Sequence, residues 1–211
     1  MRTPSNLPSP GWSSEDQALY YTANVLSGLL SGVKPNAIPR TIALMSPAED
    51  VVATGPFRRE HFGVAGDGSY QFRKISKRSS ALTAGYVMAR NSASRYNARQ
   101  AATPKWRSMD WGTLHLSMEA FYFQSEQGLS PWSFQGVDYA HMVGRSALEF
   151  GGTANSGTSV QYRVFSQWSE LGLVLWSLAR NIPHPQLLDL FPQEWKTRAQ
   201  ARGLGLPPLE D

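Results

Sequence analysis

Residues 112–123 read GTLHLSMEAFYF, and this stretch decides the class of fold. Over its first seven positions apolar and polar side chains alternate, with Leu114, Leu116 and Met118 set against Thr113, His115 and Ser117. A two-residue period predicts a strand that buries one face. Phe121 and Phe123 follow after a short turn and predict a second strand. The stretch therefore indicates antiparallel sheet.

Three further strands and a helix are expected downstream. Residues 132–139, 147–150 and 159–165 are rich in aromatic and β-branched side chains, which favour strands. Ser166 can cap a helix whose apolar stripe would cover an open sheet, namely Trp168, Leu171, Leu175, Leu178 and Ile182. Pro183 ends this helix. The order of elements predicts an α+β fold.

Upstream of the strands, the pattern predicts a hairpin and then a helix. Ala65-Gly66-Asp67-Gly68 supplies a tight turn, and Tyr70 and Phe72 alternate with polar side chains after it. Residues 79–102 change to a helical period with arginines off the apolar stripe, which consists of Leu82, Tyr86, Ala89, Ala93 and Tyr96. We expect a basic amphipathic helix that is inserted into the sheet.

Both ends of the chain are expected to lie outside the sheet. Residues 1–12 are rich in Pro, Ser and Gly and predict a flexible leader. Residues 13–47 predict a helix and a connector, with a capping box at Ser14 and Gln17. The apolar stripe of this helix would be Leu19, Ala23, Leu26, Leu30 and Val33. Residues 183–211 form a C-terminal extension with one short helix.

Composition indicates one folded, cysteine-free domain. The chain has 211 residues, of which 41% are hydrophobic and 17% charged, and this balance supports a sizeable core. The lack of cysteine excludes disulfides and thiolate chemistry. The uncharged residues 18–33 follow acidic Glu15 and Asp16, whereas a signal peptide carries basic residues there. We therefore expect a soluble, cytoplasmic protein.

Positive charge is concentrated in one part of the chain. Residues 56–107 hold eleven basic and two acidic residues and carry +9; the whole chain carries +4, so the rest carries −5. Such polarity attracts anionic partners, although the same charges can simply be solvated on separate faces. The residues assigned to anion binding are Arg58, Arg59, Arg73, Lys74, Lys77, Arg78, Arg95 and Arg99.

No catalytic, cofactor or metal site is expected. None of the four histidines lies in a known catalytic motif. Asp138 and His141 offer only two metal ligands, with no partner cluster. Residues 151–158 are glycine-rich but lack the lysine of a phosphate-binding loop, so a hairpin loop is expected there.

Two segments resemble a known class of domain. Gly112 to Ser117 with the following Phe121-Tyr122-Phe123, and also Trp132 to Tyr139, are similar to bacterial PH-like (pleckstrin-homology superfold) or GRAM-like domains. The resemblance covers about residues 48–181. It implies a bent barrel of antiparallel strands that is capped by a C-terminal amphipathic helix. Members of this superfold are mainly binding modules for anionic lipid head groups or for proteins.

These observations predict a non-catalytic adaptor or regulatory module that docks a protein partner and uses a basic face for anionic contacts. The residues assigned to partner binding lie outside the expected barrel, at Leu187, Leu188, Leu190, Phe191 and Trp195; alternatively, they pack back onto the same domain. A nucleic-acid-binding protein is a second hypothesis, since aromatics are interleaved with the basic residues. A hydrolytic enzyme that uses His115, Asp138 and His141 is a third.

Overall fold

The computed structural model describes residues 12–65, 81–153 and 157–205, which form two compact units. The sheet unit comprises Met1–Glu60 and Ser108–Asp211, and the inserted unit comprises His61–Arg107. No helix in the described part of the chain is both long and apolar enough to span a membrane.

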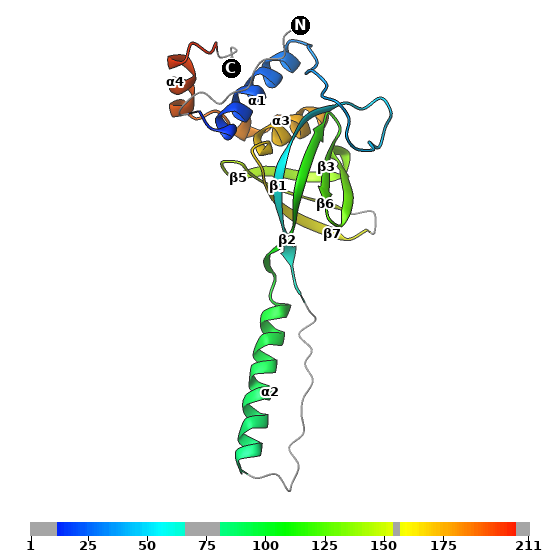
Figure 1. Cartoon of the computed structure of the whole chain (residues 1–211), viewed down its shortest axis with the longest axis vertical. Helices are drawn as coiled ribbons and strands as arrows, with labels where there is room; N and C mark the ends of the chain where they lie inside the picture. The colour runs from blue at the N-terminus through cyan, green and yellow to red at the C-terminus, as the bar shows by residue number, and fades with distance from the viewer. Residues whose placement is uncertain (1–11, 66–80, 154–156, 206–211) are drawn as a thin grey trace. The chain divides into compact units, whose positions relative to one another are not determined.

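A seven-stranded sheet in the order β4-β3-β2-β1-β7-β6-β5 forms the core of the sheet unit. The strands are β1 Val51–Gly63, β2 Lys105–Ser117, β3 Ala120–Ser125, β4 Gly128–Ser133, β5 Val137–Gly144, β6 Ala147–Thr153 and β7 Ser159–Phe165. Each of the series β2-β3-β4 and β5-β6-β7 pairs antiparallel. The sheet curls into a half-barrel (Figure 1), so the expected α+β class with antiparallel strands is confirmed.

The inner face of the sheet carries the core that the alternating pattern predicts. Leu114 lies opposite Phe123 and Leu116 opposite Phe121, and all four side chains are buried. The Phe121 ring also stacks on Phe150 of β6, with 5.1 Å between the ring centroids. Burial of each such side chain contributes about 1.5–3 kcal/mol. The aromatic core thus holds β2, β3 and β6 on one curved surface.

The expectation of a single strand over residues 132–139 is wrong. A 3-10 turn, η1 Phe134–Gly136, separates the end of β4 from the start of β5 in this stretch. The strands before and after this turn, β4 and β5, lie at opposite edges of the sheet, so the chain must leave one edge and enter the other. Phe134 is fully buried at the crossing, and its amide donates to the Glu119 carbonyl at 2.8 Å. The side chain of Ser133 accepts from the Gln135 amide.

Helix α3 Ser169–Ala179 follows β7 and packs on the sheet, and residues 169–177 are all buried. Gly172 permits the close approach, since a Cβ there would lie 2.7 Å from Cε1 of Phe121. The predicted helix is confirmed, but its start is two residues later than a Ser166 cap would place it. The Ser166 hydroxyl accepts from the Trp168 amide at 3.3 Å and donates to the Pro56 carbonyl at 2.8 Å, which ties the chain just before the helix to β1.

Helix α1 Ser14–Leu30 packs beside α3 (Figure 1). Its capping box joins Ser13 to Asp16, one residue earlier than predicted. Leu19, Ala23 and Leu26 of the predicted stripe are buried. The last two positions, Leu30 and Val33, are 65% and 61% exposed, so the expectation that the whole stripe packs is wrong.

The C-terminal extension folds back onto the start of the chain. Helix α4 Gln193–Ala201 buries Trp195 against Phe191 and Trp12, with ring centroids 5.8 and 6.1 Å apart. The predicted boundary of the flexible leader at residue 12 is wrong, because Trp12 is 8% exposed and belongs to the core.

The inserted unit contains helix α2 Ala81–Ala102, as the sequence predicts. The Ala65 amide donates to the Ala101 carbonyl at 2.8 Å, and Phe62 packs on Trp106. Of the predicted apolar stripe, Ala89, Ala93 and Tyr96 are exposed, so the expectation that they pack is wrong. Leu82 and Tyr86 lie outside the side chains that the structure describes. The two exposed alanines favour helix formation without being buried. The predicted hairpin strand over 70–73 lies outside the described residues.

A buried ion pair joins β1 to β2 inside the sheet unit. The Arg59 guanidinium donates to both carboxylate oxygens of Asp110, at 2.9 and 2.6 Å. It lies over the rings of Phe123 and Tyr162, 4.4 and 5.0 Å from their centroids. Both members of the pair are almost fully buried, so each charge depends on the other for compensation.

We expect R59M to lower the free energy of unfolding by about 3–5 kcal/mol, because it leaves the Asp110 carboxylate buried without a counter-charge. Adding D110L should restore most of the loss, since the cavity is then filled by apolar atoms. Urea unfolding followed by circular dichroism measures both effects.

The matched control is R40M, which removes the exposed Arg40–Asp50 pair and should cost less than about 1 kcal/mol. If R59M cost no more than R40M, the buried pair would not be the constraint that we describe.

Candidate functional site

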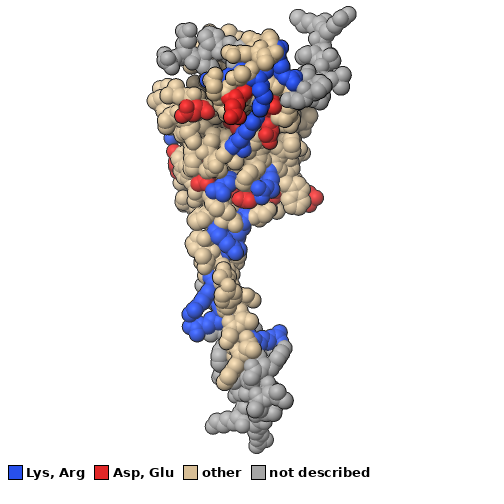
Figure 2. Space-filling model, turned by 90° about the vertical axis from the view of Figure 1, so that its left-hand side faces the viewer, with Lys and Arg blue, Asp and Glu red and all other residues tan. Residues whose placement is uncertain are grey.

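The division of the chain into two units also divides its charge. The inserted unit has one acidic residue, Asp67, and nine basic ones: Arg73, Lys74, Lys77, Arg78, Arg90, Arg95, Arg99, Lys105 and Arg107. It carries +8; the chain carries +4, so the sheet unit carries −4. In Figure 2, Lys and Arg side chains lie on both units, whereas the Asp and Glu side chains that are drawn in red lie on the sheet unit.

Two residues of the predicted anion-binding set lie on α2. Arg95 and Arg99 are exposed, and residues 81–102 include no Asp or Glu. Within the described residues neither guanidinium has an ion-pair partner. Arg99 lies in the last helical turn, where a cation is favourable beside the free carbonyls. These two side chains are available to an external anion.

The two predicted residues on β1 differ in their surroundings. Arg58 is half-exposed, lies 4.0 Å from the centroid of the Phe165 ring and pairs with Glu60 at 2.7 Å. Arg59 is buried in its pair with Asp110, so its guanidinium cannot reach an external ligand. This placement removes Arg59 from the anion-binding set.

The remaining basic residues of that set are Arg73, Lys74, Lys77 and Arg78, and they lie outside the described residues. Their assignment to anion binding stays a prediction from the sequence. The charges that they add to the inserted unit follow from the sequence alone.

Most of the residues predicted to bind a protein partner are part of the core. Leu190, Phe191 and Trp195 are at most 7% exposed, so their assignment as partner-facing residues is corrected. Leu187 is partly buried against the same core. Leu188 is 77% exposed and keeps the exposure that was expected.

Beside Leu188 lies a groove of about 650 Å³ that the sequence did not predict. We call it the aliphatic groove. Its walls come from α1, the end of α3, the turn η2 Pro185–Leu187 and α4. The lining residues are Leu26, Leu30, Ser177, Leu178, Asn181, Ile182, Pro183, Leu187, Leu188 and Lys196. The sequence indicates this groove only through the apolar stripe of α1, which continues to Leu30, past the part of the helix that is buried.

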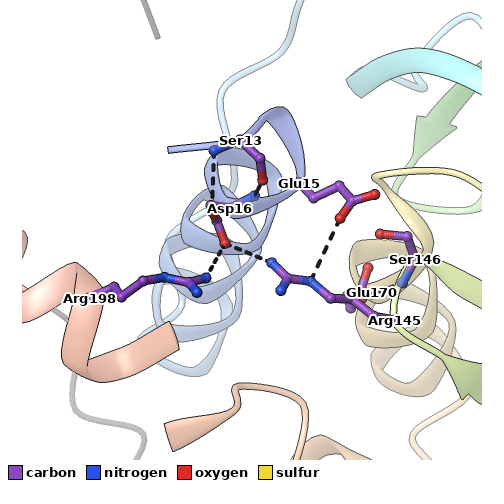
Figure 3. Close-up of polar contacts among 7 residues, drawn as sticks. All are labelled: Ser13, Glu15, Asp16, Arg145, Ser146, Glu170 and Arg198. Carbon is purple, nitrogen blue, oxygen red and sulfur yellow. Dashed lines mark hydrogen bonds and ion pairs between the residues drawn. The ribbon is translucent and has the colours of Figure 1, made fainter. Parts of the chain in front are cut away.

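A charged cluster fastens both terminal helices to the sheet (Figure 3). Asp16 of α1 accepts from Arg145, in the β5–β6 turn, at 2.7 Å and from Arg198 of α4 at 2.8 Å. Burial acts to raise the pKa of Asp16, but hydrogen bonds from Arg145 and Ser13 and the charge of Arg198 outweigh it, so the pKa is lowered. The cluster is satisfied internally and has a structural role.

Glu170 of α3 lies close to this cluster, but its pKa is shifted in the opposite direction to that of Asp16. Its carboxylate accepts from the Ser146 amide at 2.8 Å (Figure 3). Burial raises the pKa of Glu170 more than this hydrogen bond lowers it. A cavity of about 200 Å³ beside it also has Arg145 and Asp189 in its lining.

The residues of the hydrolytic hypothesis are not brought together. His115 is buried on β2, where its ring nitrogens contact Thr54 and Gln124 at 3.1 Å. Asp138 and His141 lie on β5, and three strands separate β5 from β2 in the sheet. Among the described residues, no group of three or more His, Asp or Glu side chains is arranged to hold a metal ion.

Comparison with known proteins adds no family. No protein-family model matches the chain, and no curated sequence is similar to it.

The Asp16 cluster predicts a pH dependence of stability. Because the folded-state pKa of Asp16 is lowered, its contribution is complete above the unfolded value of 3.8 and is lost as the pH falls below it. We expect D16N to cost about 1–2 kcal/mol at pH 7, since both guanidiniums are half-exposed.

The difference in unfolding free energy between D16N and the unchanged protein should shrink as the pH falls below about 4. Urea unfolding from pH 7 to pH 3 measures it, with E15Q as the control, because the Glu15 carboxylate is half-exposed and 3.8 Å from Arg145. A difference that stayed constant over this range would contradict the assignment.

Proposed function

We propose that the protein is a non-catalytic adaptor or regulatory module, built on a PH-like barrel, that binds an acidic protein partner through the inserted unit. The strand order supports the PH-like assignment, because two meanders meet at the β1–β7 pairing and leave the sheet open between β4 and β5. Helix α3, which follows the last strand and packs on the sheet, agrees with the expected capping helix.

The separation of charge between the two units is the observation that carries this proposal. A unit with +8 and a single acidic residue cannot neutralise itself, so it attracts anions from solution. Arg95 and Arg99 present guanidiniums that lack an internal counter-ion in the described residues. Such forks bind carboxylates in a bidentate manner.

The other exposed side chains of α2 favour a protein as the partner. Met88 is 60% exposed and Tyr96 is 63% exposed on the same helix as the two arginines. Tyr, Met and Arg are enriched in protein interfaces, and Lys, Glu and Asp are depleted. A partner with carboxylates around a small apolar area would match this combination.

Nucleic acid is the second candidate, and the exposed ring of Tyr96 favours it. An aromatic side chain between arginines can stack on a base while the guanidiniums contact phosphates. Binding of this kind weakens steeply with salt, because phosphate contacts release counter-ions.

The double variant R95E/R99E should weaken capture of the partner about tenfold or more, because each substitution places a negative charge against an acidic surface. The full tagged chain is used to capture host proteins after nuclease treatment, at low and high salt, and the bound protein is quantified. Circular dichroism of the variant checks that α2 remains helical.

The control is K34E/R40E, which reverses two exposed charges on the sheet unit and should leave capture unchanged. Equal capture by both double variants would overturn the proposal. Nucleic acid that was retained at low salt and lost after nuclease treatment would replace the protein partner with the second candidate.

A further inference from the structure

The aliphatic groove is the largest of the cavities described above, and it belongs to the sheet unit alone. Its volume of about 650 Å³ lies within the range of about 300–1,000 Å³ that is typical of small-molecule sites. Six of its lining residues are leucines or isoleucine, at Leu26, Leu30, Leu178, Ile182, Leu187 and Leu188.

The Ser177 hydroxyl and two backbone amides at the end of α3 already have partners within the chain. The Ser177 hydroxyl donates to the Ile182 carbonyl, and the Ile182 amide donates to the Ser177 carbonyl at 2.9 Å. The Asn181 amide donates to the Leu178 carbonyl at 3.1 Å. These groups therefore offer no free donor to a ligand, and among the described residues the carboxamide of Asn181 is the one polar side chain of this part of the lining whose hydrogen-bonding groups remain for a ligand. The leucines and isoleucine around them favour aliphatic contact.

Lys196 is the one charged residue in the lining. It lies on α4, is partly buried, and has no ion-pair partner within the described residues. A partly desolvated ammonium beside aliphatic walls gains from a counter-ion that can share its surroundings. A ligand with an aliphatic body and a single anionic end supplies both features.

We propose that the aliphatic groove binds an aliphatic carboxylate, with the chain along the leucines and the carboxylate at the Lys196 ammonium. The groove offers one cation and one continuous aliphatic lining, which matches a ligand with one charge and one chain. The inference goes beyond the proposed function, because every lining residue lies outside the inserted unit.

Dodecanoate, used below its critical micelle concentration, is a suitable probe for the full chain. Isothermal titration should give saturable binding of one dodecanoate per chain. K196M should weaken it about tenfold, as expected for the loss of one charge-assisted contact. Dodecanol should bind the unchanged protein about tenfold more weakly than dodecanoate does, and K196M should not alter its affinity.

Two further variants separate the groove from the rest of the surface. L188D places a carboxylate on an exposed wall position, where it leaves folding intact and should abolish dodecanoate binding. K34M removes an exposed lysine of the sheet unit that does not line the groove, and it should leave the affinity unchanged.

Absence of saturable binding, or equal weakening by K196M and K34M, would overturn the proposal. Analytical ultracentrifugation of the same variants tests another occupant. A dimer of the unliganded protein that L188D converts to a monomer would show that a second copy fills the groove, and the carboxylate site would be rejected.

Discussion

The buried pair of Arg59 and Asp110 is the constraint on which the sheet unit depends. Arg59 lies two residues before the inserted unit begins at His61, and Asp110 lies three residues after that unit ends at Arg107. With the guanidinium held between Phe123 and Tyr162, the pair closes the core at that end. No described residue of 61–107 contributes to the hydrophobic core. The inserted unit can therefore carry its charge without a part in the packing.

The spacing of apolar side chains along the sequence predicted the elements that are set by residues close to one another in the chain. The strand over 159–165 was predicted with the bounds that β7 has, and each of the described helices was expected within a few residues. Burial of Arg59 was not predictable, because its carboxylate partner is 51 residues away and its ring contacts come from β3 and β7. The turn at Phe134 likewise follows from where β4 and β5 lie in the sheet.

In the candidate site, too, the features set by local sequence were predictable and those set by tertiary packing were not. Charge is additive along a sequence, so the basic segment could be found by counting, and Arg95 and Arg99 are exposed as expected. Whether an apolar helix face meets a partner or its own domain depends on tertiary packing. Trp195, which the sequence predicts to face a partner, is therefore buried in the core, where its ring packs on Trp12. The aliphatic groove needed four separate elements to form and left almost no local signal.

The inserted unit enters and leaves the sheet unit through β1 and β2, which are neighbours in the sheet. A chain that exits and returns on adjacent strands closes a loop, and doubling the length of such a loop costs only about 0.6 kcal/mol. The sheet unit can thus accept inserted segments of different length and charge between β1 and β2. Changes in the sequence of the inserted unit would then alter what the protein recognises, while the fold of the sheet unit stayed the same.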